Sequence, residues 1–300
     1  MLYPSRLYVY VDAVARAGSI RKAAEKLHVA STALNRKILE AEENLGTPLF
    51  ERLPRGVRLT AAGEILVSHI RRSFNDFDYA ISQVEQLRGL MRGVVRLACA
   101  ESVATDIIPH ITAMYQVKHP GVQFQLTVGG TQNLLQALLD DQVELLVAHD
   151  PPAHAQVTVH GAIAQPLHAM MHADHPLAKH ASLRLADCQP WPVVLGDESF
   201  GSRRLIEQHL AKSRIQLRVV VESGSVETCK AFARHAQAIC FQFEAGTRRD
   251  VALGELVAIP LTDTDLAGSR LVLASRSGRA LPTAASSFLE SLRAALFGKQ

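Results

Sequence analysis

Cysteine and long apolar runs are scarce in this sequence of 300 residues. Cys99, Cys188, Cys229 and Cys240 are the four cysteines, and none belongs to a Cys-x-x-Cys pair or shows another metal-ligand spacing. We expect buried free thiols in a reducing cytoplasm, with Cys229 and Cys240 as the alternative of a redox-sensing pair. No apolar run reaches the roughly 18 residues of a membrane span, and the N-terminus shows no export signal. The sequence therefore predicts a cytoplasmic protein without a membrane segment.

Motifs of the common enzyme classes are also missing. The chain has no GxGxxG, GxSxG, P-loop or HExxH pattern. It is rich in histidine, with thirteen residues, and His168, His172, His175 and His180 crowd one region. Their spacings straddle an expected strand and a proline turn, so solvated or structural histidines are favoured over a metal site. We expect no catalytic residue, no metal and no cofactor, although an enzyme built on an α/β sheet remains an alternative.

The composition is that of a folded chain whose charge is placed unevenly. Hydrophobic residues make up 48% of the sequence, which argues against disorder, and the length suits two or three domains. Residues 1–60 hold ten Lys or Arg and six Asp or Glu, a surplus of four, in a chain of net charge +3. This N-terminal surplus is typical of nucleic-acid binding. Because the surplus is modest, we expect one subunit to bind weakly and a dimer to bind well.

The stretch from Ser19 to Asn44 has the pattern of two short helices joined by a tight turn. Ser19 is an N-cap candidate for a helix that extends through Leu27. A second helix is expected from about Ser31 to Asn44, where Ala30 cannot cap through its side chain, so we expect Ser31 or Thr32 to do so. Helical spacing predicts that the buried stripe of this second helix consists of Ala33, Leu34, Ile38 and Ala41.

The outward faces of the second helix carry small alcohols, an amide and cations. Such groups contact bases and phosphates when a helix lies in the major groove of DNA. Pro54-Arg55-Gly56 then predicts a turn between two short segments, which would form a basic wing. We therefore expect an all-α winged helix-turn-helix over residues 1–60 that binds double-stranded DNA through Ser31, Thr32, Asn35, Arg36, Lys37, Arg52, Arg55 and Arg58. An ordinary helical hairpin with a solvated basic face is the alternative.

One long helix is expected from Thr60 to about Leu90. It contains no Pro and no Gly after Gly63, and Thr60 can cap it. Its other faces carry polar residues, among them Arg71 and Arg72. We interpret residues 61–91 as a linker helix that pairs two subunits, with a core helix of the next domain as the alternative. The coiled-coil-like seam that supports this interpretation consists of Leu66, Ile70, Phe74, Phe77, Ile81, Val84, Leu87 and Met91.

Apolar strands alternate with helices from Val94 onward. This alternation predicts an α/β fold made of βαβ units, with a parallel sheet covered by helices on both sides. The expected elements of the first part are Val94–Ala100, Ile107–Lys118, Val122–Val128, Gln132–Asp140 and Leu145–Ala148. Those of the remainder are Leu167–Met171, Val193–Leu195, Ser202–Ser213, Leu217–Val221, Ser225–His235, Ala238–Phe241, Arg270–Ser275 and Pro282–Leu296.

Short polar residues follow the expected strands, where open α/β sheets bind their ligands beside helix N-termini. Backbone N–H groups and hydroxyls at such places suit a carboxylate or a similar small anion. The alternative is that the hydroxyl residues only cap helices. The candidate ligand-binding residues are Ser102, Thr131, His149, Ser199 and Ser202, with Phe200 as an apolar wall.

The N-terminal segment resembles the DNA-binding segment of LysR-type transcriptional regulators. The match is specific because many positions agree in register over about 45 residues. The matching residues are Ser19, Ala23-Ala24, Leu27, Val29, Ala33-Leu34, Arg36, Ile38, Leu45-Gly46, Pro48-Leu49-Phe50, Arg52, Leu59-Thr60 and Ala62-Gly63. Weaker matches follow at Ile107-Ile108-Pro109, His119-Pro120, Gln136 to Glu144, His175-Pro176-Leu177-Ala178 and Phe288.

The resemblance implies a two-lobed module, similar to periplasmic solute-binding proteins, over residues 92–300. Lobe I would cover about 92–165 and 267–300, and lobe II about 166–266. It also implies effector contacts at the strand ends that match Ser102, Thr131, His149 and Ser199, and assembly as a homodimer or homotetramer. Family members commonly open the recognition helix with Ser-Gln, where this chain has Ala30-Ser31, so base preference is not carried over.

We therefore expect a sequence-specific DNA-binding transcription regulator that responds to a small, anionic effector between two α/β lobes. A cytoplasmic small-molecule-binding protein with an accessory helical domain, and no regulatory DNA site, is the alternative.

Overall fold

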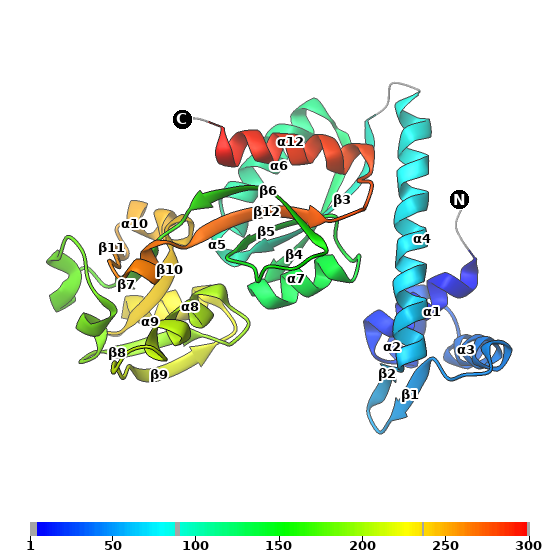
Figure 1. Ribbon diagram of the computed structural model, residues 1–300, viewed down its shortest axis with the longest axis horizontal. Coiled ribbons are helices and arrows are strands. Elements are labelled where there is room, and N and C mark those ends of the chain that lie inside the picture. Colours follow the sequence, from blue (N-terminus) through cyan, green and yellow to red (C-terminus); the bar gives the residue numbers. More distant parts are fainter. Residues whose placement is uncertain (1–4, 88–90, 236, 299–300) are drawn as a thin grey trace. The chain divides into compact units, whose positions relative to one another are not determined.

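The computed structural model describes residues 5–87, 91–235 and 237–298, which form two compact units (Figure 1). One unit comprises Met1–Leu90 with Ala280–Thr283, and the other comprises Met91–Arg279 with Ala284–Gln300. The predicted fold class is confirmed, since a helical winged segment and a long helix precede two α/β sheets. The domain boundaries at residues 60 and 91 stay predictions. No described helix has both the length and the apolar character needed to cross a membrane.

Three short helices open the first unit, and serine side chains cap the first two of them. They are α1 (Arg6–Ala17), α2 (Ile20–Leu27) and α3 (Ser31–Leu45). Ser5 Oγ accepts a hydrogen bond from Leu7 N at 3.3 Å, and Ser19 Oγ accepts one from Lys22 N at 3.5 Å. These hydroxyls satisfy N–H groups that the first turn leaves without helical partners. The predicted cap at Ser19 is therefore confirmed.

The N-terminus of α3 differs from the expectation. Ala30 is the N-cap residue and provides no side-chain hydrogen bond, and the helix already includes Ser31. The expectation that Ser31 or Thr32 caps the helix is wrong, and both side chains are exposed. Ala33 is also exposed rather than buried, because the stripe through Leu34, Ile38 and Ala41 already fills the face that packs on the unit's core.

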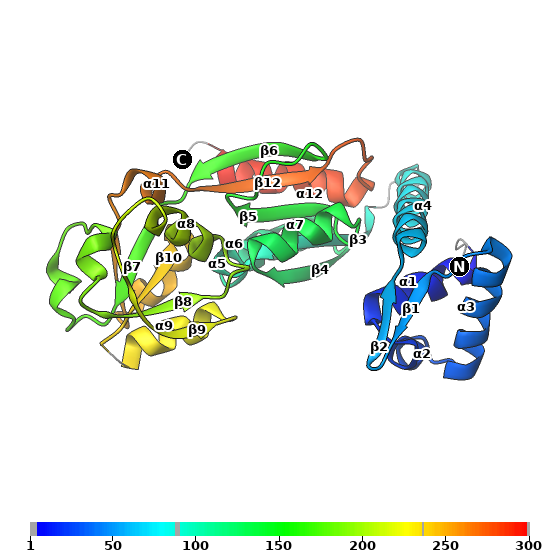
Figure 2. The same cartoon turned by 60° about the horizontal axis from the view of Figure 1, so that its bottom comes forward.

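The predicted wing is a two-stranded antiparallel hairpin, β1 (Phe50–Leu53) and β2 (Gly56–Leu59), visible in Figure 2. Gly56 has a φ of 131°, and a Cβ there would collide with the carbonyl oxygen of Gly18 at the end of α1. Val57 N donates a hydrogen bond of 2.9 Å to the same oxygen. The hairpin is thus fixed against α1 by backbone contacts that only glycine permits.

Helix α4 (Ala61–Gln86) is the long helix of the first unit. Thr60 Oγ1 accepts a hydrogen bond from Gly63 N at 3.1 Å, as its predicted capping role requires. Arg71 is not on a solvated face as expected, because it is buried and donates to Asp12 of α1 at 2.8 Å. The helix ends before the predicted Leu90. Leu87 lies in a turn, and residues 88–90 are outside the described part of the chain.

Lobe I of the second unit is a five-stranded mixed sheet of order β4-β3-β5-β12-β6. The strands β3, β4 and β5 are parallel, whereas β12 is antiparallel to both β5 and β6. The predicted parallel sheet is therefore correct for three strands only. The strands are β3 (Arg92–Ala100), β4 (Gly121–Gly129), β5 (Leu145–His149), β6 (Val157–Ala164) and β12 (Arg270–Arg276).

Helices cover both faces of this sheet, as Figures 1 and 2 show. Helices α6 and α12 lie on one face, where Tyr115, Phe124 and Phe288 form edge-to-face ring contacts. Helix α7 packs on the other face through Leu134 and Leu138. The helices of lobe I are α5 (Glu101–Ala104), α6 (Ile107–Lys118), α7 (Thr131–Leu139) and α12 (Thr283–Phe297).

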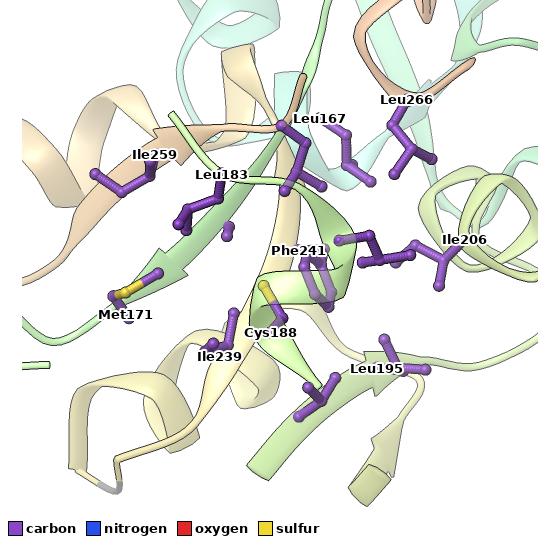
Figure 3. Packing of buried hydrophobic residues seen from close by; sticks show 14 of the residues in the cluster. Leu167, Met171, Leu183, Cys188, Leu195, Ile206, Ile239, Phe241, Ile259 and Leu266 are labelled. Carbon is purple, nitrogen blue, oxygen red and sulfur yellow. The ribbon is translucent and has the colours of Figure 1, made fainter. Parts of the chain in front are cut away.

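Lobe II contains a second mixed sheet of order β11-β7-β10-β8-β9. Alternate residues of each strand face opposite sides, as a strand's period of two requires. Phe241 and Leu195 join the core with Ile206 of α8 (Figure 3), whereas Cys240 and Val194 face α9 with Cys229. The strands are β7 (Leu167–Met171), β8 (Pro192–Gly196), β9 (Arg218–Ser223), β10 (Ile239–Phe243) and β11 (Val257–Pro260).

The helices of lobe II are short. Those of α type are α8 (Gly201–Leu210), α9 (Val226–His235), α10 (Arg248–Ala252) and α11 (Thr264–Ala267). The 3₁₀ turns are η1 (Pro176–Lys179), η2 (Leu185–Cys188) and η3 (Glu244–Gly246). Helices α8 and α9 begin after the carboxyl ends of β8 and β9, and η3 follows that of β10.

Candidate functional sites

The outer face of α3 presents most of the residues expected to contact DNA. Ser31, Thr32, Arg36 and Lys37 are exposed to solvent. Asn35 is half-buried, and its Oδ1 is enclosed without a hydrogen-bond partner in the described part of the chain. A face that combines hydroxyls with two cations, and that packs on nothing within its own unit, fits the chemistry of a DNA groove.

Glu40 holds the two cations of this face in place. Arg36 Nε lies 3.6 Å from Glu40 Oε1, and Lys37 Nζ lies 2.6 Å from Glu40 Oε2. The hydrogen bond from Lys37, together with the charges of Lys37 and Arg36, lowers the pKa of Glu40 although burial opposes this. The Glu40 side chain is 45% exposed, so solvent weakens these ion pairs and a phosphate can compete for the same cations.

The wing carries the other three expected cations. Arg52, Arg55 and Arg58 are all exposed. Arg58 forms an ion pair of 2.6 Å with Glu51 on the neighbouring strand. Arg52 and Arg55 form no ion pair with any residue that the structure describes. These two guanidinium groups are free to bind phosphates, which would fix the position of the hairpin on a duplex.

A small cavity between the lobes brings together five of the six residues expected to bind a ligand. Ser102, Thr131 and His149 line it from lobe I, and Phe200 and Ser202 line it from lobe II. Its volume is about 20 Å³, which is room for about one water molecule. The lobes must therefore move apart before a larger ligand can enter.

The sixth candidate, Ser199, does not line this cavity. Its backbone N–H and its hydroxyl both donate to Asp197 Oδ1, at 2.9 and 2.6 Å. The Ser199 carbonyl oxygen accepts a 3.4 Å hydrogen bond from Gln132 N of α7. Ser199 thus lies at the junction of the two lobes with its side chain already engaged.

His149 is the most enclosed polar group of the cavity. Its Nε2 lies 2.7 Å from Ser102 Oγ, and its ring stacks on Phe243 of lobe II with centroids 3.7 Å apart and planes 11° apart. Burial lowers the pKa of His149 to about 3, so the ring is neutral at physiological pH. Its buried Nδ1 has no hydrogen-bond partner among the described residues. A ligand in the enlarged cavity would be such a partner.

Glycines allow the lobes to touch around the cavity. A Cβ on Gly130 of lobe I would lie 2.5 Å from the carbonyl oxygen of Ser199 in lobe II. A Cβ on Gly201 would lie 3.0 Å from Thr131 Oγ1, and one on Gly246 would lie 3.0 Å from Ser102 Cβ. Real Cβ atoms do not approach a backbone oxygen as closely as 2.5 Å, so Gly130 must stay glycine while the lobes are closed, whereas a Cβ at Gly201 or Gly246 would require its neighbour to shift slightly.

Sequence reasoning missed several residues that line the same cavity. The missed group is Glu101, Val226, Gln242 and Phe243. The sequence did carry a signal for Gln242 and Phe243. The apolar pattern Ile-Cys-Phe-Gln-Phe extends β10 two residues past its expected end, and this places both residues at the carboxyl end of the strand. Glu101 directly precedes Ser102 and would have followed from the same rule. No comparable signal marked Val226.

The four cysteines are buried, and the crowded histidines belong to no metal-binding group among the described residues. All four thiols are buried and free. Burial raises the pKa of Cys99 and Cys188 to about 12 and that of Cys229 to about 11, and it raises the pKa of Cys240 as well. Thiols in this state lack the thiolate that redox sensing uses. The described residues contain no group of three or more His, Cys, Asp or Glu that could hold a metal ion.

Comparison with known families and structures agrees with this geometry. Residues 5–64 match the family described as "Bacterial regulatory helix-turn-helix protein, lysR family", and residues 88–297 match "LysR substrate binding domain". A RuBisCO operon transcriptional regulator from Acidithiobacillus ferrooxidans is 29% identical over 247 residues, which cover 82% of this chain and 80% of that relative.

Two solved structures show the same fold. Full-length CbnR, complexed with its target DNA, superposes with a TM-score of 0.64 at 19% identity, covering 97% of this chain and 99% of that chain. The regulatory domain of CcmR from Synechocystis, in complex with 2-PG, gives a TM-score of 0.62 at 20% identity, covering 68% of this chain and 97% of that chain.

Proposed function

The chain belongs to the LysR family of DNA-binding transcription regulators with an effector-binding domain, and from this we propose a role for each of its two units. In the first unit, α3 and the β1–β2 wing bind a specific DNA site. In the second unit, a small effector binds between the lobes and changes their arrangement. The family membership makes the protein a regulator rather than an enzyme. As a regulator of bacterial DNA it would act in the cytoplasm.

The exposed polar face of α3 carries the DNA-binding proposal. Arg36 and Lys37 form ion pairs with the carboxylate of Glu40, which a phosphate can replace. Ser31 and Thr32 lie on the same helix and are exposed. A base-contacting arginine is worth about 1–3 kcal/mol of discrimination. Support also comes from CbnR, whose structure in complex with its target DNA has the same fold. The wing arginines Arg52, Arg55 and Arg58 would supply phosphate contacts.

A gel-shift titration tests this proposal with DNA that flanks the coding region. We expect Arg36→Ala to lose about 1–3 kcal/mol of specific binding while its thermal melt stays that of the wild type. Arg21→Ala, which removes an exposed arginine of α2, is the matched control. Equal affinity of wild-type protein for flanking and random DNA at moderate salt would contradict sequence-specific binding.

The effector proposal depends on the small cavity between the lobes. Hydroxyls of Ser102, Thr131 and Ser202 converge there with the neutral ring of His149 and the ring of Phe200. These groups, with the N-termini of α7 and α8, suit a small molecule that has an anionic group such as a carboxylate. CcmR, whose regulatory domain has the same fold, is described in complex with 2-PG.

A thermal-shift screen with small carboxylates tests the effector proposal, because a ligand of the native state raises the melting temperature. A hit should lose its effect in Thr131→Val, which removes a hydroxyl that lines the cavity at nearly constant side-chain volume. Thr158→Val, at an exposed position of β6, is the matched control. Retained binding in Thr131→Val and Ser202→Ala together would place the ligand elsewhere.

A further inference from the structure

Among the described residues that line the cavity, Glu101 is the one charged side chain, and one of its oxygens already accepts a hydrogen bond. It belongs to α5 of lobe I, and its Oε2 accepts a 3.2 Å hydrogen bond from Val226 N, the first residue of α9 in lobe II. A carboxylate can accept about four hydrogen bonds. In the described residues, the other oxygen, Oε1, has no partner. The position of the Glu101 carboxylate is therefore fixed through Oε2, while Oε1 can still accept a hydrogen bond from a ligand in the cavity.

The lining contains no compensating cation. It includes neither Lys nor Arg, and burial keeps His149 in its neutral form. The nearby Arg203 is bound to Glu207 and Glu222, and Arg204 donates to the carbonyl oxygen of Asp150. An effector that was only an anion would meet the negative charge of Glu101 without a cation to offset it.

Two helix N-termini in the same lining nevertheless favour an anionic group. Helix α7, of nine residues, and helix α8, of ten, both begin at N-cap residues that give no side-chain hydrogen bond. Their first residues meet, since a Cβ on Gly201 would lie 3.0 Å from Thr131 Oγ1. In α7, the Gln132 N–H already donates to the Ser199 carbonyl oxygen at 3.4 Å, and the remaining N–H groups of such a helix N-terminus bind carboxylates well.

Two side chains of the lining also have a polar atom without a partner among the described residues. Ser202 of α8 is 9% exposed, and its hydroxyl forms no hydrogen bond to any residue that the structure describes. His149 is 2% exposed, and its Nδ1 is likewise unpaired there. Enclosed polar groups of this kind cost free energy unless a ligand or water satisfies them. The cavity therefore offers donors at the helix ends and an acceptor at Glu101.

We propose that the effector is a small zwitterion of the α-amino acid class, bound with its ammonium group at Glu101 and its carboxylate at the N-termini of α7 and α8. This inference rests on the proposed effector site and names the class of molecule that the site takes. Opposite charges on one small molecule match both the acceptor and the donors of the lining, whereas a plain acid or a plain amine matches only one of them. Phe200 and Phe243 leave an apolar wall for the side chain.

The test uses the full-length protein and the twenty common amino acids. Thermal shift identifies those that stabilise it, and calorimetry then compares each one with the acid that lacks the amine and the amine that lacks the carboxyl. For alanine these are propionate and ethylamine. We expect an amino acid to bind at least about tenfold more tightly than either counterpart, since a hydrogen bond between charged groups is lost in each.

Glu101→Gln separates the charge from the fold, because the amide oxygen can still accept from Val226 N. This variant should bind the amino acid about ten- to a hundredfold more weakly and bind the matching acid no more weakly than wild type does. Glu198→Gln, which removes an exposed carboxylate of the loop before α8, should leave both affinities unchanged. Circular-dichroism melts check that each variant folds.

Three results would overturn the proposal: no amino acid stabilises the protein, an acid binds as tightly as its amino acid, or Glu101→Gln retains amino-acid affinity. An acid that binds without its amine would leave the broader proposal of an anionic effector standing. Gel shifts on the same preparations report DNA binding separately, so failure of the regulator function would be recognised independently.

Discussion

At the scale of single residues, His149 shows how burial sets the charge of a side chain in the cavity. Its ring lies between Ser102 of its own lobe and Phe243 of the other, and burial lowers its pKa from 6.5 to about 3. A protonated ring would be a buried cation without a counter-ion. The neutral ring instead offers a hydrogen bond of either polarity, according to its tautomer, without adding charge to the cavity.

This shift makes stability depend on pH. The unfolded state takes up the His149 proton near its ordinary pKa of 6.5, whereas the folded state does so only near 3. The unfolded state thus binds more protons between these values, and the free energy of unfolding falls as pH is lowered from 6.5, by about 1.4 kcal/mol per pH unit. His160 and His175, whose pKa values burial also lowers, act in the same direction.

Urea unfolding of wild type and His149→Asn at several pH values from about 7 to 5 measures this contribution. We expect the variant to lose part of the pH slope, whatever its absolute stability. His110→Asn, at an exposed histidine of α6, should keep the wild-type slope. Identical slopes for wild type and His149→Asn would show that His149 is not buried as the structure has it.

Gly130 and Gly129 form a matched pair for the contact between lobes. A Cβ on Gly130 would strike Ser199 of the other lobe, whereas a Cβ on Gly129 has nothing within 4 Å. Gly130→Ala should therefore destabilise the closed lobes by about 1–3 kcal/mol, through overpacking, and Gly129→Ala should cost much less. Hydrogen exchange of the first turns of α7 and α8 checks this. Equal protection in both variants would mean that the lobes do not close here.

Ligand-site residues were predictable only where a general rule applies to them. Ser102, Thr131 and His149 lie at strand ends or helix starts, and they do converge on one cavity. Their roles in binding stay predictions. Val226 was missed because its contact with Glu101 depends on the packing of two lobes that are far apart in the sequence. No local pattern carries that information.

At the scale of elements, α3 combines the cations expected to bind DNA with an acid that competes for them. Glu40 pairs with both Arg36 and Lys37, which limits unspecific attraction to phosphates. Replacing it removes one negative charge from the surface proposed to contact DNA and frees both cations. The helix itself should persist, since Glu and Gln have similar helix propensities.

Glu40→Gln should therefore bind random DNA more tightly, on the order of three- to tenfold at low salt, with a smaller gain as salt rises. Glu43→Gln removes an exposed acid of the same helix that has no ion pair within the described residues, and serves as the control. Fluorescence anisotropy over a salt series gives both affinities. If Glu43→Gln gains as much as Glu40→Gln, net charge alone accounts for the effect.

Element prediction succeeded where one pattern was strong and failed where tertiary contacts decide. The helix Ile107–Lys118 and the strand Leu167–Met171 have the predicted bounds. The strand β6 was missed because Gly161 interrupts its apolar pattern. That glycine is required by packing, since a Cβ there would lie 2.5 Å from the ring of Phe297 in α12. The short strand β11 was missed as well.

At the scale of the whole molecule, the second half of α4 and the turn residue Leu87 leave apolar side chains in solvent. Ile81, Val84 and Leu87 are 36%, 52% and 88% exposed. They continue the seam whose earlier members, such as Ile70, are buried in the first unit's core. We propose that this exposed part pairs with the same part of a second copy, which would place two wings on one duplex.

Val84→Glu tests this pairing, because a charge buried in an apolar seam is costly. We expect the association constant measured by sedimentation to fall by about tenfold or more, and specific DNA affinity to fall with it. Ser68→Glu places the same charge at an exposed position on the opposite side of α4 and should leave association unchanged. A monomeric wild-type protein at micromolar concentration would contradict the pairing.

The directions of the strands in lobe I could be predicted from the sequence only in part. The βαβ pattern correctly predicts that β3, β4 and β5 are parallel, because a helix joins each pair. It gives no information on β12, which reaches lobe I after the whole of lobe II and pairs antiparallel with β5. Such a connection follows from long-range packing rather than from local periodicity.

The small volume of the cavity between the lobes also limits the rate at which a ligand can bind. With about 20 Å³ available, a metabolite cannot occupy the site until the lobes separate, so encounter waits for that opening. In stopped-flow mixing, the observed rate should level off at high metabolite concentration, at the frequency with which the lobes part. The close contacts at the glycines between the lobes would then set the opening rate, and so the delay before transcription responds to the ligand.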